Sequence, residues 1–338
     1  MSAKQSSRPK VPGTRILGTG HYAPSRVLTN HDLERMVDTS DAWIVERTGI
    51  RERHIAADGE ASSDLAAEAA RRALQAAGVE ASELDLIIVA TVTPDRPLPA
   101  TAVYVQQKIG ARPDCPAFDV VAACAGFIYG LSIGDRFVSS GGARRVLVVG
   151  VELLSRVLNW KDRTTCVLFG DGSGAAVLGP SEGDGRGILS THLFADGGQA
   201  ESLHIPAGGS RLPACQATVE EGLHFVHMSG SDVFKYAVRA LSSASMTALE
   251  ANGMGIDDVS WVVPHQANMR IIDAVSRRLR IGLDRFVINI DRFGNTSSAS
   301  IPIALDEAVR DGRVTPGQHT LMCALGGGFA WGSALVRW

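Results

Sequence analysis

The feature that most constrains the fold is a helix followed by a buried strand, a pattern that occurs twice in the sequence. Ser62–Ala77 begins with serine, consists mostly of strong helix formers and is followed by Gly78, so it predicts a helix. The apolar run at 84–91 then has the length of a buried strand. In the second half, 237–251 predicts a helix and 259–264 another buried strand. This alternation is typical of an α/β protein.

Two further pairs of segments repeat in the same order. The strand expected at 117–123 is matched by one expected at 285–291, and the segment 166–178 is matched by 320–336. Three pairs in one order indicate an internal duplication.

The duplication predicts two related α/β halves, 11–180 and 181–338, that meet at a linker near 180–187. Equivalent strand ends in two such halves are expected to bring residues from both halves to one place.

Composition argues against several classes of function. A net charge of −3 over 338 residues gives no basic field for nucleic acid. No apolar run approaches the roughly 18 residues that a membrane helix needs, and the polar segment 1–10 lacks the apolar core of a signal peptide, so we interpret it as a frayed tail. The five cysteines include no CxxC pair, which argues against disulfides and zinc and favours a reducing cytoplasm.

Cys124 lies between the strand expected at 117–123 and a helical segment at 125–140. A thiol at such a junction faces the positive end of the helix dipole, which can lower its pKa from about 8.5 to roughly 3.5–7.5. Cys124 is therefore a candidate nucleophile. From this local context alone, an inert buried cysteine fits equally well.

Three other positions at strand ends can carry chemistry. His265 follows the strand at 259–264, and Asn295 lies in a loop after the segment 285–291. The glycines at 326–328 let backbone N–H groups approach a ligand closely. Taken singly, each also fits a structural interpretation: a core histidine, a turn asparagine and a tight hairpin.

The sequence around these positions resembles β-ketoacyl-acyl-carrier-protein synthase III, the initiating condensing enzyme of type II fatty acid synthesis. The motifs are DVVAACAGF with Cys124, VPHQANMRII with His265, DRFGNTSSAS with Asn295, and GGGFAWGSALV near the C-terminus, with further matches at 40–56, 167–179 and 305–318. The resemblance extends from Val11 to Trp338. It implies the thiolase-like fold, with duplicated βαβαβαββ halves in five αβαβα layers.

The resemblance implies a decarboxylating condensation. An acyl-CoA, either acetyl-CoA or a short or branched starter, acylates Cys124, while backbone N–H groups of Cys124 and Gly327 form the oxyanion hole. Malonyl-acyl carrier protein then loses CO₂ with His265 and Asn295 as donors, and β-ketoacyl-acyl carrier protein forms. An amide at Asn295 can donate a hydrogen bond but cannot take a proton, which suits decarboxylation. CoA thioesters are substrates here, and neither a cofactor nor a metal is expected.

Binding sites also follow from the resemblance. Four residues match family contacts to CoA: Trp43, Arg47, Arg163 and Asn268. Four basic residues match the docking patch for the acidic carrier protein: Lys235, Arg270, Arg277 and Arg278. Without the resemblance, solvated surface charges are the simpler interpretation of these cations. The family is a homodimer in which a residue at the position of Leu98, often phenylalanine, closes the acyl pocket of the partner, so Leu98 suggests longer or branched starters.

Four alternatives remain open. The nearest is a synthase III-like ketosynthase of secondary metabolism with a different acyl donor or acceptor. A nucleotide-binding protein would use the GxGxxA motif at 170–175, although the sequence after it continues as a strand, so we interpret it as a turn. A papain-like hydrolase also uses Cys, His and Asn, but the sequence motifs around them differ from those found here. A non-catalytic binding module would require the combination of Cys124, His265 and Asn295 to have arisen by chance.

Overall fold

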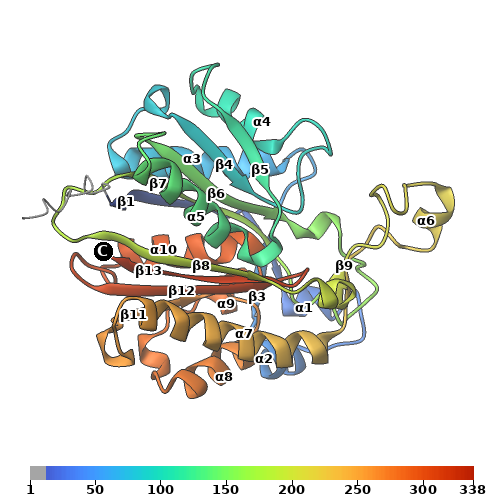
Figure 1. Ribbon diagram of the computed structural model, residues 1–338. Helices are drawn as coiled ribbons and strands as arrows, with labels where there is room; N and C mark the ends of the chain where they lie inside the picture. Colours follow the sequence, from blue (N-terminus) through green and yellow to red (C-terminus); the bar gives the residue numbers. More distant parts are fainter. Residues whose placement is uncertain (1–12) are drawn as a thin grey trace, which may run out of the picture.

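The computed structural model describes residues 13–338, which form two main β-sheets with the same arrangement (Figure 1). In spatial order, the first sheet contains β1 (Thr14–Tyr22), β7 (Asp171–Pro180), β6 (Val146–Leu153), β4 (Leu86–Ala90) and β5 (Ala117–Val120). The second contains β8 (Gly187–Ala195), β13 (Ala330–Arg337), β12 (His319–Gly326) and β11 (Trp261–Pro264). In the first, two antiparallel pairs are followed by two parallel pairs, and in the second by one, because among the described residues the second sheet has no counterpart of β5. The second half therefore repeats the first, as the duplication predicts.

The pairing of segments needs two corrections. In space β13 corresponds to β7 and β12 to β6, so only the second part of 320–336 is the equivalent of 166–178. The strand predicted at 285–291 is wrong: only Phe286 forms an isolated parallel bridge, to Val262. In place of backbone hydrogen bonds to a neighbouring strand, the side chain of Gln266 binds this segment: it accepts the N–H of Asn289 and donates to the carbonyl of Val287.

Helices complete five layers, which Figure 1 shows from top to bottom. The outer face of the first sheet is covered by α3 (Ser62–Ala77) and α4 (Thr101–Ile109), the space between the sheets holds α5 (Gly126–Ser139) and α10 (Ser300–Arg310), and the second sheet is covered by α7 (Gly230–Ala251) and α8 (Met269–Leu279). The predicted αβαβα order is present. The helix predicted at 237–251 begins earlier, at Gly230.

Packing explains why these sequences form these layers. The alanine-rich face of α3 lies so close to β1 that a Cβ on Gly20 would come within 2.4 Å of the backbone nitrogen of Ala73. The middle layer is apolar, with Phe127 and Leu131 of α5 fully buried among side chains from both sheets. Burial of this kind is the main favourable contribution to folding.

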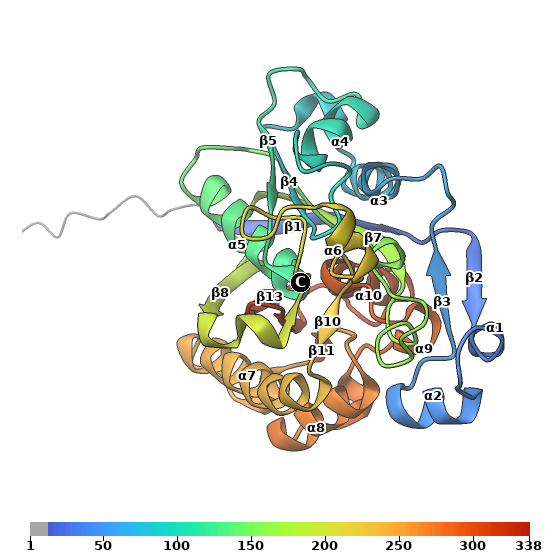
Figure 2. The ribbon, with the colours of Figure 1, turned by 90° about the vertical axis from the view of Figure 1, so that its right-hand side faces the viewer.

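The smaller elements lie at the edges of the layers. They are β2 (Arg26–Thr29), α1 (Asn30–Leu33), α2 (Asp41–Thr48), β3 (Glu52–Ile55), β9 (Leu203–His204), α6 (Gln216–Glu220), β10 (His227–Met228) and α9 (Ile290–Phe293). Figure 2 shows the antiparallel pair of β2 and β3, with α1 and α2 that connect them, on one side of the molecule, and β3 contacts α9. Among residues 13–338, no helix has both the length and the apolar character needed to cross a membrane.

The expected domain boundary lies outside regular structure. β7 ends at Pro180 and β8 begins at Gly187, on either side of the expected linker. The division into domains at 11–180 and 181–338 stays a prediction, and the tail expected at 1–10 and the start at Val11 lie outside the described residues.

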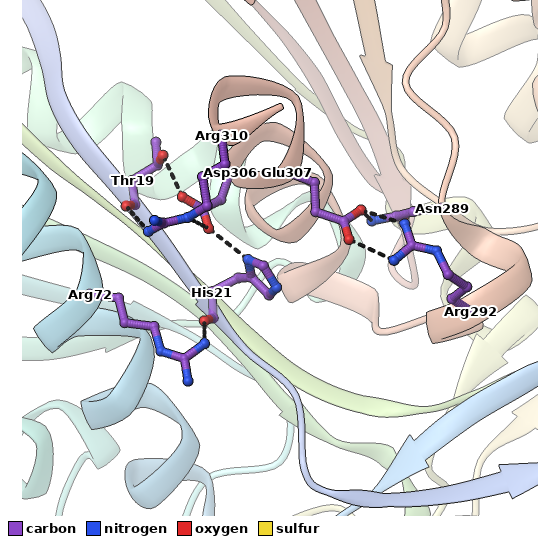
Figure 3. Close-up of polar contacts among 8 residues, drawn as sticks. All are labelled: Thr19, His21, Arg72, Asn289, Arg292, Asp306, Glu307 and Arg310. Atoms are coloured by element: carbon purple, nitrogen blue, oxygen red, sulfur yellow. Dashed lines mark hydrogen bonds and ion pairs between the residues drawn. The ribbon is translucent and has the colours of Figure 1, made fainter. Parts of the chain in front are cut away.

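A buried carboxylate on α10 joins the two halves (Figure 3). Asp306 is 1% exposed and accepts hydrogen bonds from Thr19 and His21 of β1 and from Arg310. Burial alone would raise the pKa of Asp306, but these hydrogen bonds, that of His21 foremost, hold it below its usual range. The middle helix is thereby fixed to the first sheet.

Candidate active site

Cys124 lies in a short 3-10 turn, Ala123–Ala125, between β5 and α5. The strand predicted to reach residue 123 ends at Val120, and Ala123 adopts a left-handed conformation with φ 44°. A Cβ on Gly326 would lie 2.3 Å from the backbone nitrogen of Cys124, so glycine is needed where β12 of the second half ends beside the turn. Cys124 therefore lies between elements of both halves.

The expected lowering of the Cys124 pKa is not what the site shows. Burial raises the pKa of the Cys124 thiol to about 12, hydrogen bonding with the Ser297 side chain opposes this, and the nearby Glu152 adds to it. The prediction of a stabilised thiolate is wrong for the resting site because Cys124 is buried, with only 7% of the residue exposed. Cys124 is a free, neutral thiol until something removes its proton.

Two cavities meet at Cys124. The first, of about 580 Å³, is lined by His265, Asn295 and residues of α2, α7 and α8. The second, of about 490 Å³, is mainly apolar and includes Gly327 and Ser297 in its lining. Besides Cys124, Phe169 and Leu203 line both. We call the first, which holds His265 and Asn295, the entrance chamber and the second the apolar chamber; the thiol lies between them.

His265 follows β11 and is 2% exposed. Its Nδ1 lies 2.6 Å from Oγ of Ser300, which also accepts the backbone N–H of Gln266 at 3.4 Å. In the tautomer in which Nδ1 accepts the Ser300 hydroxyl proton, the ring proton lies on Nε2. Burial lowers the pKa of His265 to about 3, so the ring is neutral at pH 7.

Asn295 is held by its neighbours in a buried loop. Its Oδ1 accepts the N–H of Ser297 at 2.9 Å, and its backbone pairs with Leu168 and Gly170. With Oδ1 engaged, the group that Asn295 can offer to the entrance chamber is its Nδ2 amide. Both His265 and Asn295 therefore present a neutral N–H donor.

The mouth of the entrance chamber carries the candidate CoA residues. Trp43 and Arg47 lie on α2, and the guanidinium of Arg47 is 5.3 Å from the centre of the Trp43 ring. The guanidinium of Arg163 lies at the same distance from that ring, although Arg163 is not among the lining residues. Asn268 donates to the carbonyl of Arg47 at 3.1 Å and caps α8 by accepting the N–H of Arg270.

The candidate docking cations lie at the same mouth or just beyond it. Lys235 and Arg270 line the chamber, and the guanidinium of Arg270 is 5.7 Å from the Phe234 ring centre. Arg277 and Arg278 lie in the last turn of α8, where Arg277 pairs with Asp273 at 2.5 Å.

Leu98 is not among the residues that line either chamber and is 84% exposed. The GxGxxA motif at 170–175 leads into β7 rather than a helix, so it lacks the setting of a nucleotide site, and the turn expected there is largely strand. Within residues 13–338 no group of three or more His, Cys, Asp or Glu side chains could hold a metal ion.

Three polar residues of the site were missed from the sequence: Glu152, Ser297 and Ser300. Glu152 was detectable as the one acid in the apolar strand Val146–Leu153, and the two serines as part of the run after Asn295. What could not be read from the sequence is that all three side chains gather behind Cys124 and His265.

Comparisons with known proteins decide the family. The family model described as 3-oxoacyl-[acyl-carrier-protein (ACP)] synthase III matches residues 118–197, and the model of its C-terminal part matches 249–338. A β-ketoacyl-[acyl-carrier-protein] synthase III of Rhodospirillum centenum is 56% identical over 326 residues, covering 96% of this chain and 98% of that protein. The chain belongs to the β-ketoacyl-acyl-carrier-protein synthase III family. The predicted recognition is confirmed, and with it the chain is an acyl-transferring condensing enzyme.

Solved structures agree. The structure of the 3-oxoacyl-[acyl-carrier-protein] synthase III of Aquifex aeolicus matches with a TM-score of 0.89 at 47% identity, and the match covers 96% of this chain and 100% of the Aquifex chain. The priming β-ketosynthase of the R1128 polyketide pathway has a TM-score of 0.89 at 38% identity, with 98% of both chains covered. The predicted thiolase-like fold is confirmed.

Proposed function

We propose that this enzyme condenses an acyl-CoA with malonyl-acyl carrier protein to give β-ketoacyl-acyl carrier protein, CO₂ and CoA, and so initiates type II fatty acid synthesis, with Cys124, His265 and Asn295 as its catalytic residues. The observation that carries the proposal is that these three side chains line one chamber although they come from different halves. The curated relatives between 53% and 56% identity share the name of this synthase, so a ketosynthase of secondary metabolism is not favoured.

The first half-reaction acylates Cys124. Arg47 and Trp43, with Arg163 against the same ring, form a planar surface on which an adenine base can stack at the mouth. The thioester carbonyl then reaches Cys124, whose own N–H and that of Gly327 stabilise the oxyanion by about 3–4 kcal/mol for each donor. The acyl chain occupies the apolar chamber, and CoA leaves.

The second half-reaction uses the donors of the entrance chamber. Loss of CO₂ places negative charge on the malonyl thioester oxygen, where Nε2–H of His265 and Nδ2–H of Asn295 stabilise it. Because His265 is neutral, its proton stays on the ring and acts as a hydrogen-bond donor. The resulting carbanion attacks the acyl group on Cys124. No base is needed, since decarboxylation itself generates the nucleophile.

Substrate delivery and assembly complete the proposal. Asn268 lies where the pantetheine arm of CoA or carrier protein would pass, and four cations dock the acidic carrier protein: Lys235, Arg270, Arg277 and Arg278. Leu98 and Val121 are large apolar side chains left 84% and 77% exposed, and Val121 lines the apolar chamber. We propose a homodimer that covers both and lets Leu98 close the partner's chamber.

The enzyme uses CoA thioesters as substrates, and we propose that it needs no cofactor. The five cysteines are free thiols, which is consistent with the cytoplasm as its proposed compartment.

The division of labour can be tested by separating the half-reactions. His265→Ala and Asn295→Ala should abolish CO₂ release from malonyl-acyl carrier protein and leave the first-turnover release of CoA from acyl-CoA largely intact. Cys124→Ala, in contrast, should abolish the first-turnover release of CoA from acyl-CoA. Equal loss of both half-reactions in the His265 and Asn295 variants would contradict the assignment.

A further inference from the structure

Glu152 is a buried acid that the mechanism above does not use. It lies on β6 with 0% exposure, and its carboxylate accepts hydrogen bonds from Thr93 at 2.8 Å, Ser298 at 3.0 Å and Ser297 at 3.2 Å. Within residues 13–338 no lysine, arginine or histidine forms an ion pair with it. A buried carboxylate without a cation is costly, and such groups concentrate at functional sites.

Ser297 connects this carboxylate to the thiol. It lines the apolar chamber beside Cys124, hydrogen bonding with its side chain lowers the pKa of the Cys124 thiol, and its hydroxyl donates to Oε1 of Glu152 at 3.2 Å. Its φ of 49° is uncommon for a residue other than glycine, and the contact of its N–H with Oδ1 of Asn295 holds it there. The backbone is therefore set so that one hydroxyl lies between Cys124 and Glu152.

The thiol proton needs an acceptor, and two titratable groups lie near. Cys124 is neutral at rest because burial raises its pKa. His265 is a poor acceptor, since burial lowers its pKa to about 3. Burial raises the pKa of Glu152 to about 7, with hydrogen bonds from Thr93, Val92, Ser298 and Ser297 opposing it, so this carboxylate can take and return a proton near neutral pH.

We propose that Glu152 is the proton acceptor for Cys124 during acylation, with the Ser297 hydroxyl as the relay between them, an inference that rests on Cys124 being the nucleophile. As the sulfur bonds to the thioester carbonyl carbon, its proton moves to Ser297 and the Ser297 proton moves to Glu152. When the carbon–sulfur bond to CoA breaks, Glu152 returns its proton to Ser297, and Ser297 passes a proton to the leaving CoA sulfur rather than back to Cys124. Cys124 ends acylated, CoA leaves as the thiol, and Glu152 and Ser297 return to their starting states.

The test is the rate of the first acylation, measured as CoA release and as added acyl mass on Cys124 in a single turnover. Glu152→Gln and Ser297→Gly, the latter suited to the left-handed backbone, should each slow acylation about 100-fold, as expected for loss of proton transfer. The double variant should be no slower than the slower single one, because both interrupt one path. Condensation by enzyme already acylated should keep its rate in all three.

Ser298→Ala is the matched control. It removes a hydroxyl that bonds the same carboxylate at 3.0 Å but is not part of the chamber lining, so its effect should be at least tenfold smaller. If Glu152 acted only through its charge, Glu152→Gln would favour the thiolate and speed acylation; a rate equal to or above that of the wild type overturns the proposal. If Glu152→Gln fails to fold, unchanged acylation in Ser297→Gly overturns it instead. Absence of acyl mass on wild-type Cys124 would refute the nucleophile assignment itself.

Discussion

Replacing Ser300 by alanine should impair decarboxylation selectively. The Ser300 hydroxyl lies 2.6 Å from Nδ1 of His265, and both residues are only 2% exposed, so water does not easily take its place. Loss of the partner leaves a buried ring nitrogen unpaired, at about 1–3 kcal/mol, and removes the contact that keeps the proton on Nε2. If that stabilisation is lost from the transition state, the rate falls roughly 5- to 140-fold, since 1.4 kcal/mol corresponds to tenfold.

The assay compares two half-reactions in one variant. CO₂ release from malonyl-acyl carrier protein should fall by that factor in Ser300→Ala, while the first-turnover acylation of Cys124 should change less than about twofold. Ser300→Thr keeps a hydroxyl at the same place and should restore most of the decarboxylation. Equal losses in both half-reactions would show that Ser300 supports only the fold of the site. An unchanged rate of CO₂ release would refute the tautomer argument.

Three further predictions address docking, specificity and stability. Arg270→Glu should raise the KM for malonyl-acyl carrier protein roughly tenfold at low salt, with less effect at high salt and little on the CoA substrate, as steady-state kinetics at two ionic strengths would show. Leu98→Phe should lower the kcat/KM for isobutyryl-CoA relative to acetyl-CoA by about tenfold, because a misfitting group in an apolar pocket costs about 1–3 kcal/mol. Burial raises the pKa of Glu152 from 4.5 to about 7, so the folded protein favours the protonated carboxyl. The stability that this protonation provides is fully present below pH 4.5 and is lost as the pH rises through 7. In urea unfolding, the free energy of unfolding of Glu152→Gln should therefore rise relative to that of the wild type by up to about 3 kcal/mol between pH 4.5 and 8. A difference between the two free energies that does not change with pH would contradict ionisation of the buried carboxyl as the cause.

The fold was predictable where local and tertiary preferences agree. Ser62–Ala77 matches α3 residue for residue, because continuous helix formers lie between a serine and a left-handed Gly78. The first turns of α7 were missed because Gly230 and its polar neighbours favour a loop locally. They are helical since Val233 and Phe234 pack against the core that lies over the second sheet. Tertiary contacts override weak propensity in such segments.

The site was predictable only as far as motifs reach. Strand ends and family resemblance located Cys124, His265 and Asn295, but the neutral state of the thiol depends on burial, which no local pattern encodes. The contact of Ser297 with Glu152 joins residues 145 positions apart, and each belongs to a different half. Long-range polar contacts of this kind decide where protons move, and they exist only once the two halves have packed together.

The middle helix α10 explains how residues from two halves keep a fixed geometry. Ser300 at its start contacts His265, and Glu307 near its end accepts from Asn289 and, through both oxygens, from Arg292, which both precede the loop of Asn295. Asp306 beside it binds Thr19 of the first sheet (Figure 3). The adjacent acids of the segment 305–318 therefore have separate roles: one fixes α10 to the first half, and the other holds the Asn295 loop to α10. A shift of this helix would move both His265 and Asn295 relative to Cys124, so the geometry that the proposed decarboxylation requires is set by one element of the middle layer.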